Sequence, residues 1–198
     1  MLIHVHGEYG LFTNPAMPAD RVSFSVPPFS TLGGLLRAFY WKRGIDWKIN
    51  RVWVMNELTF CQVMRNERIP SEKEAITQRH TLYVRNPSYV IHAQIIATEG
   101  GQEERHAQEM KGAAMAGAWL RSGRRRLPPF LGARECGAFL APPPWADFEE
   151  RAARKNIRMP KLGSMPTKIL YDETGTPVGA EWGEYVWENG SYALRDIP

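Results

Sequence analysis

Three consecutive arginines, Arg124, Arg125 and Arg126, lie within the glycine- and proline-rich segment SGRRRLPPFLGARECGAFLAP at 122–142. Guanidinium groups form charge-assisted hydrogen bonds with phosphate oxygens, and glycines allow backbone N–H groups to approach a ligand closely. The segment, which also carries Arg134, is therefore suited to binding a phosphate backbone. A solvated basic turn has the same composition and is the simpler alternative.

His106 lies beside Arg105, upstream of the arginine segment, so a group that can take up and release a proton stands next to a fixed cation. A metal-free ribonuclease needs such a pair. A base activates the 2′-hydroxyl of RNA, the oxygen attacks the adjacent phosphorus, and a cation stabilises the charge that develops on the phosphoryl oxygens. A surface histidine at the start of a helix is the competing interpretation.

Tyr40 lies in the segment FYWKR at 39–43, which mixes aromatic and basic side chains, among them Lys42. The Tyr40 hydroxyl could bind the same phosphate as the pair above, or its ring could stack on a base. Aromatic rings beside cations suit single-stranded RNA, because rings stack on bases while cations follow the backbone. The same mixture would also suit a domain interface.

Motifs that bind metals or nucleotide cofactors are absent from the sequence. It contains no P-loop and no GxGxxG, HExxH or CxxC pattern, and its five histidines are scattered. His4 and His6 point to one face of a predicted strand, but two ligands make a poor metal site. We therefore expect neither a catalytic metal nor a cofactor.

The composition indicates a folded protein with a modest basic excess. The chain has 198 residues, 43% of them hydrophobic, with 25 Lys and Arg against 21 Asp and Glu. Much of the excess falls within 121–134. Cys61 and Cys136 are far apart in the sequence and are interpreted as reduced thiols. With neither a signal sequence nor an apolar run that could span a bilayer, we expect a cytoplasmic protein that does not enter the membrane.

Hydrophobic patterning predicts the elements that position these residues. The first part of the chain should contain strands at 2–9, 21–26, 49–55 and 58–64, and a helix with apolar residues at 32, 35, 36 and 39, capped by Ser30 or Thr31. Gly33 and Gly34 suggest a close approach to another group in the first turn of that helix. The charged stretch 65–79 is predicted to be a loop or the tip of a protruding hairpin.

Further along, strands at 80–85 and 89–97 should form an antiparallel pair, followed by a helix at about 103–120 and a strand at 133–140. This order predicts an α+β fold, ferredoxin-like or RRM-like, with an inserted β-hairpin. After Ala141 the composition changes, and short strands at 167–171 and 183–188 predict a small β-rich lobe. The expected division is therefore 1–141 and 142–198.

Five segments resemble, in order, one family: the RAMP-type CRISPR-associated proteins of the fifth family, subtype d, which belong to type I-C systems. The segments are GEYGLFTNP (7–15), SFSVPPFSTLGGLLRAFYWK (23–42), MRNER (64–68), QRHTLYVRNPSYVI (78–91) and FLGARECGAFLAP (130–142).

This resemblance implies a ferredoxin-like domain with a small C-terminal β-sheet domain, and a metal-independent endoribonuclease that cuts CRISPR repeat transcripts on the 3′ side of a stem-loop. It also implies that the 5′ handle stays bound within a complex that contains backbone and large subunits. In that setting the three arginines could contact the handle and not the scissile phosphate.

The family's active site is described as a tyrosine, a lysine and an adjacent histidine, which match Tyr40, Arg105 and His106. Arginine in place of lysine keeps the positive charge but has no proton to transfer, so a phosphate-stabilising role survives and a general-acid role does not. Lys111, further along the predicted helix, is a possible substitute. A non-catalytic subunit that holds the handle is the alternative, and generic RNA binding by an RRM-like sheet lacks a visible aromatic motif.

Overall fold

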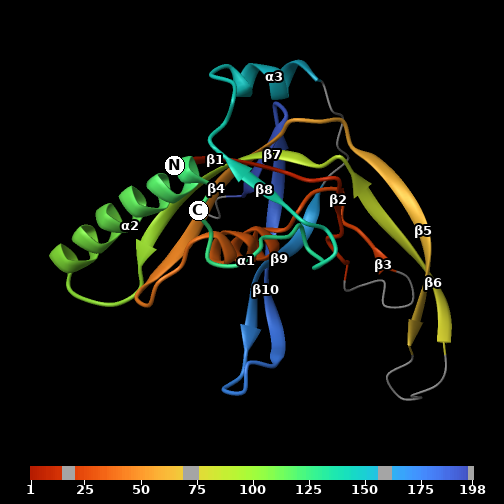
Figure 1. The fold of residues 1–198 in the computed structure, drawn as a ribbon, viewed down its shortest axis with the longest axis horizontal. Helices are drawn as coiled ribbons and strands as arrows, with labels where there is room; N and C mark the ends of the chain where they lie inside the picture. The colour runs from red at the N-terminus through yellow and green to blue at the C-terminus, as the bar shows by residue number, and fades with distance from the viewer. Residues whose placement is uncertain (15–20, 69–75, 156–161, 196–198) are drawn as a thin grey trace.

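The computed structural model describes residues 1–14, 21–68, 76–155 and 162–195 (Figure 1). Its larger sheet has seven strands in the order β8-β1-β7-β4-β11-β10-β9, each antiparallel to its neighbours. The strands are β1 (Leu2–His6), β4 (Ile45–Val54), β7 (Ser88–Ala97), β8 (Phe139–Ala141), β9 (Gly163–Tyr171), β10 (Pro177–Glu188) and β11 (Ser191–Leu194). Together with the three helices found among the described residues, they confirm the predicted α+β class.

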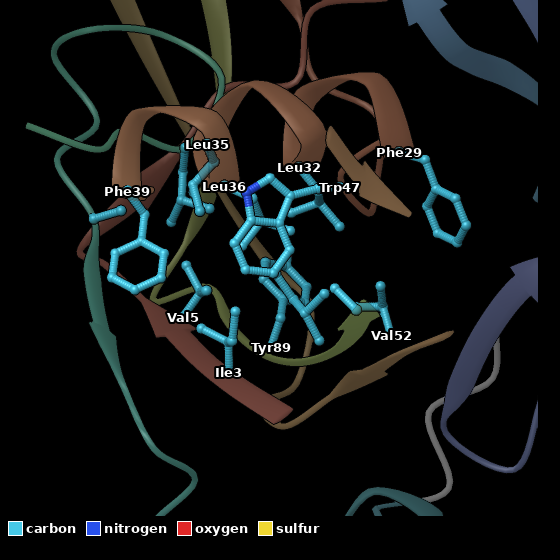
Figure 2. Close-up of a cluster of buried hydrophobic side chains, with 14 of the residues drawn as sticks. Ile3, Val5, Phe29, Leu32, Leu35, Leu36, Phe39, Trp47, Val52 and Tyr89 are labelled. Carbon is cyan, nitrogen blue, oxygen red and sulfur yellow. The ribbon is translucent and has the colours of Figure 1, made fainter. Parts of the chain in front are cut away.

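Two helices, α1 (Phe29–Phe39) and α2 (Gln102–Ser122), pack against one face of this sheet. The predicted spacing of apolar residues in α1 is confirmed, because Leu32, Leu35, Leu36 and Phe39 are all buried (Figure 2). Each buried side chain of this kind contributes roughly 1.5–3 kcal/mol. The helix begins at Phe29 after Pro28, and no described side chain caps it, so the predicted Ser30 or Thr31 cap was wrong.

The opposite face of the sheet carries a smaller cluster. Strand β1 alternates, so Ile3 and Val5 join the main core while His4 points to the other side. There α3 (Phe148–Arg154) packs on β4 and contributes Phe148 to a buried group with Trp53. The segment 148–154, which follows the predicted boundary at 141/142, therefore forms a short helix that covers part of this face.

The second sheet contains β2 (Tyr9–Gly10), β3 (Arg21–Val22), β5 (Thr59–Arg68) and β6 (Ile76–Arg85). Its long β5–β6 hairpin projects from the body (Figure 1). The stretch 65–79 was predicted as a loop or the tip of a protruding hairpin, and the hairpin alternative is confirmed, because 65–68 and 76–79 are paired strand. Residues 69–75 lie outside the described residues. The predicted pairing of 80–85 with 89–97 was wrong: Asn86, at φ 48°, leads the chain out of β6 in one sheet and into β7 in the other.

The C-terminal strands β9, β10 and β11 form an antiparallel arm, and β11 is hydrogen-bonded to β4. Tyr192 of β11 is fully buried, and its hydroxyl donates to the Pro27 carbonyl (2.8 Å). Strand pairing and core packing therefore continue across the predicted boundary at 141/142. Among the described helices, none is long and apolar enough to cross a membrane.

Candidate nucleic-acid interface

The arginine segment is held against the end of α1. Helix α2 ends at Ser122, and the next residue, Gly123, adopts a left-handed φ of 71° and donates its N–H to the Trp119 carbonyl. Beyond it, the backbone N–H groups of Arg126 and Leu127 donate to the carbonyls of Phe39 and Ala38, both at 2.9 Å. These carbonyls lie in the last turn of α1, where intrahelical partners run out. The two basic and aromatic segments singled out in the sequence thus lie side by side.

At this junction five residues, Tyr40, Trp41, Trp119, Arg124 and Arg126, form what we call the aromatic–arginine cluster. The Arg124 guanidinium carbon lies 4.5 Å from the centroid of the Trp119 ring, and that of Arg126 lies 5.7 Å from the centroid of Trp41. Both distances fall within the range of cation–π contacts. Both guanidinium-bearing residues and Trp41 are exposed. The cluster therefore offers cations and ring faces to solvent together, the combination that binds single-stranded nucleic acid.

Tyr40 is the buried member of the cluster, with 1% of its surface exposed. Its ring is nearly perpendicular to that of Trp119, with centroids 5.0 Å apart, and its carbonyl accepts a hydrogen bond from Trp47 Nε1 (2.8 Å). Burial raises the pKa of the Tyr40 hydroxyl, so that hydroxyl keeps its proton near neutral pH. In this structure the Tyr40 side chain packs against the Trp119 ring and exposes little surface that a ligand could contact.

Arg105 and His106 lie at the other end of α2, where both are exposed. His106 precedes Trp119 by 13 residues, which at 1.5 Å and 100° per residue places the two about 20 Å apart along the axis and on nearly opposite sides of the helix. The structure therefore does not bring Tyr40 together with the predicted arginine and histidine. Lys111, also exposed, lies between them, about 12 Å from Trp119 along the axis.

The remaining predicted contact residues lie at different distances from the cluster. Lys42 follows it directly and is exposed, as is Arg134 further along the loop. Arg125 lines a hollow of about 370 Å³ together with Tyr9, Glu135 and other residues of the loop. Of the predicted RNA-binding residues, Lys42, Arg124, Arg125 and Arg126 thus lie near one another, and Lys111 lies apart from them.

Hydrogen bonds from the projecting β5–β6 hairpin hold Glu135, which lines this hollow. Arg65 of β5 donates to the Tyr83 hydroxyl (2.8 Å) and to the Glu135 carboxylate. A backbone hydrogen bond and the Arg65 guanidinium lower the pKa of Glu135 against the opposing effect of burial, while burial raises the pKa of the Tyr83 hydroxyl. The Arg65 charge is thus matched by a carboxylate, and the hairpin is linked to the loop.

Trp119 and the Arg65–Glu135 pair were missed in the sequence. A lone tryptophan in an alanine- and glycine-rich helix, five residues before the three consecutive arginines, is a signal that could have pointed to Trp119. No comparable signal exists for a pair separated by 70 positions. Among the described residues, no group of three or more His, Cys, Asp or Glu side chains is arranged to hold a metal ion.

Residues 1–175 match the family described as CRISPR-associated protein (Cas_Cas5), subtype Cas5d. A protein of Mannheimia succiniciproducens named CRISPR pre-crRNA endoribonuclease Cas5d is 27% identical over 88% of this chain and 87% of its own length. A Thermus thermophilus protein of the same name is 29% identical over 71% of the chain and 63% of its own length.

Two solved structures share the fold. One is described as a CRISPR-associated protein (TM-score 0.72, 24% identity) and the other as a functionally uncharacterized protein from Streptococcus mutans (TM-score 0.70, 23% identity). Each is matched over 98% of this chain and 91% of its own length. Because the family match spans most of the sequence, the chain belongs to the Cas5d family of CRISPR-associated proteins.

Proposed function

We propose that this protein is a metal-independent endoribonuclease that cuts CRISPR repeat precursor RNA on the 3′ side of the repeat stem-loop. The names of the two curated relatives support the activity. The structural observation that carries the proposal is the aromatic–arginine cluster, where Arg124 and Arg126 lie over tryptophan rings beside the end of α1. Such a surface can bind backbone phosphates while its rings stack on unpaired bases.

In this proposal the chemistry is assigned to α2. His106 removes the proton from the 2′-hydroxyl, the oxygen attacks phosphorus, and the 5′-oxygen leaves with a proton, producing a 2′,3′-cyclic phosphate. Arg105 stabilises the charge on the phosphoryl oxygens. Arg105 cannot give the proton that leaves with the 5′-oxygen, so that proton comes from water. Lys111, five residues after His106 and about 140° around the helix from it, is assigned to binding the RNA backbone. Tyr40 is buried, so its assigned role is to hold Trp119 in position through the contact between their rings.

The finer assignments belong to the same proposal. The order β8-β1-β7-β4, with α1 between β1 and β4 and α2 between β7 and β8, supports a ferredoxin-like core. After cleavage, the protein would keep the 5′ handle and join backbone and large subunits of a type I-C surveillance complex in the cytoplasm. Arg124, Arg125 and Arg126 would then hold the handle.

A second function, a subunit that binds the handle without cutting RNA, is favoured by one observation. His106 lies about 20 Å along α2 from Trp119, the residue whose ring contacts Tyr40. The predicted catalytic residues are therefore separated. The aromatic–arginine cluster contains Tyr40 and is complete without Arg105 and His106. Binding alone therefore does not distinguish the two functions.

The test is cleavage of the cognate repeat RNA in excess EDTA, with protein in excess over RNA so that binding is saturated. Parent protein should cut at one site. His106→Ala should bind equally and cut at least a hundredfold more slowly, whereas His80→Ala, which removes an exposed histidine on β6, should cut at the parent rate. If His106→Ala cuts like the parent, His106 is not the base. If the parent binds the repeat and leaves it whole, the protein is a handle-binding subunit.

A further inference from the structure

We infer that Phe139 and His6, at the open edge of the large sheet, form a platform on which one unpaired RNA base stacks. The inference rests on the proposed RNA-binding function and adds a contact outside the aromatic–arginine cluster. Strand β8 is the last strand of the sheet, and its pairing with β1 sets Phe139 directly opposite His6. The two rings are stacked, with centroids 5.4 Å apart and planes inclined by 21°.

The platform has a fixed base beneath it. His6 stacks in turn on His4, with centroids 5.0 Å apart and an interplanar angle of 26°. His4 is buried, its Nε2 is hydrogen-bonded to the Ser88 hydroxyl (2.9 Å), and Trp145 packs edge-on against it. Three rings therefore form a ladder whose inner member is immobilised by the sheet and whose outer member is held in register by β8.

The outer end of the ladder is open. Phe139 is 62% exposed and His6 is also exposed, and both lie on the sheet face opposite α1 and α2. An exposed aromatic ring on an edge strand leaves apolar surface in contact with water. Stacking a second flat ring on it would bury that surface and so be favourable. RNA-binding sheets use this face to stack unpaired bases on aromatic side chains.

The surroundings favour a nucleotide over an apolar protein segment. On one side, a hollow of about 410 Å³ is lined by His6, Trp145, Asn56 and Asn86, whose amides can bond to base edges. Asn56 Nδ2 donates to the Asn86 backbone carbonyl (2.9 Å), which fixes the Asn56 amide at the rim of this hollow.

On the other side of Phe139 lies the hollow of about 370 Å³ that Arg125 also lines, so a backbone phosphate next to the stacked base would lie near the arginine loop. Two carboxylates line that hollow, Glu8 and Glu135, and the second is paired with Arg65. The platform and the aromatic–arginine cluster thus lie along one path, with Arg125 between them.

The experiment measures fluorescence anisotropy of the labelled repeat RNA at fixed salt, with Phe139→Ala, Phe139→Trp and the control Trp182→Ala, which removes a half-exposed tryptophan on β10. Phe139→Ala should weaken binding about tenfold, because a stacked base contributes that much, while Phe139→Trp and Trp182→Ala should bind like the parent. Single abasic substitutions along the RNA then locate the base: at one position the loss caused by Phe139→Ala should disappear.

The outcomes separate this inference from the function on which it rests. If the parent binds and cuts the repeat but Phe139→Ala binds equally well, the platform is overturned and the proposed function stands. If Phe139→Ala weakens binding by the same factor at every abasic position, no base occupies the platform and the inference is also overturned. If the parent does not bind the repeat RNA at all, both fall.

Discussion

The ring of Tyr40, at the end of α1, lies at 85° to the ring of Trp119, near the end of α2, with 5.0 Å between their centroids. This contact joins the two helices at the point where the arginine loop leaves α2. Arg124 covers Trp119, so a change at Tyr40 reaches the exposed cation through one intervening ring. RNA binding and core packing are therefore coupled at this end of the molecule.

The arginine loop should determine the salt dependence of RNA binding. Arg124→Ala and Arg125→Ala should each weaken binding about tenfold and lower the slope of log K against log salt by about 0.7, because each lost phosphate contact releases less counterion. Arg126 is a poorer test, since its Nε donates to the Arg37 carbonyl (3.1 Å) and anchors the loop. Arg154→Ala, at an exposed site on α3, is the control. An unchanged slope would contradict the contact.

The sequence was a good guide where one segment determines its own structure. The α1 and α2 helices, the β9–β10 arm and the basic character of 122–134 follow from local patterns. Contacts between distant segments were not predictable. The strand expected at 133–140 is strand only from Phe139, because Gly132, at φ 85°, and a turn that bonds Cys136 N–H to the Ala133 carbonyl keep the preceding residues irregular.

The candidate site shows the same limit. Residue types identified the FYWK and arginine segments, but the tertiary contacts that bring them together, among them the bonds from the arginine loop to the Phe39 and Ala38 carbonyls, could not be predicted. Conversely, Tyr40 and His106 were expected to lie together because of the family resemblance, but they lie near opposite ends of α2. Local patterns therefore fixed which residues could act, and tertiary packing decided which of them meet.

Gly132 should be essential for the loop, whereas Gly137 in the same loop should not. A Cβ at Gly132 would lie 1.9 Å from the Leu11 carbonyl oxygen, at a φ of 85° that side chains rarely adopt. Gly132→Ala should cost about 3 kcal/mol or more and lower Tm by roughly 10 °C. A Cβ added at Gly137 would meet no described atom within 4 Å beyond its chain neighbours, so Gly137→Ala should change stability by about 0.5 kcal/mol at most. Thermal unfolding of both variants tests this difference. Equal Tm values would contradict the close approach of Gly132 to the Leu11 carbonyl.

Gly34 should be replaceable by alanine with a gain in stability. A close approach was expected at Gly33 and Gly34, but a Cβ at either meets no described atom within 4 Å beyond the local helix backbone. Both line an open groove of about 280 Å³. Gly34→Ala should therefore stabilise α1 by about 1 kcal/mol, the difference in helix propensity. Denaturant unfolding measures the change, and a loss of stability would show that the glycine is needed for packing.

His4 should make the protein lose stability in mild acid. Burial and the nearby charge of His6 lower the pKa of His4 to about 4, from 6.5. Below pH 6.5 the unfolded chain takes up a proton that the folded protein refuses, so stability is complete above that pH and falls as the pH drops towards 4. The loss is on the order of 3 kcal/mol.

A His4→Gln variant, whose amide can still bond to Ser88, should show a flatter curve of unfolding free energy against pH between 6.5 and 4. Burial also lowers the pKa of His92, which stays in both proteins and leaves a residual slope. Parallel curves for parent and variant would show that His4 is not the group responsible.

The most direct test of the proposed activity is the chemistry of the cut ends. Parent protein should cut the repeat RNA in EDTA, leaving a 2′,3′-cyclic phosphate that mass spectrometry detects, and a single 2′-deoxy substitution at the cleaved nucleotide should abolish the cut. An RNA that is bound but left whole, or that is cut despite the 2′-deoxy substitution, would contradict attack by the 2′-hydroxyl.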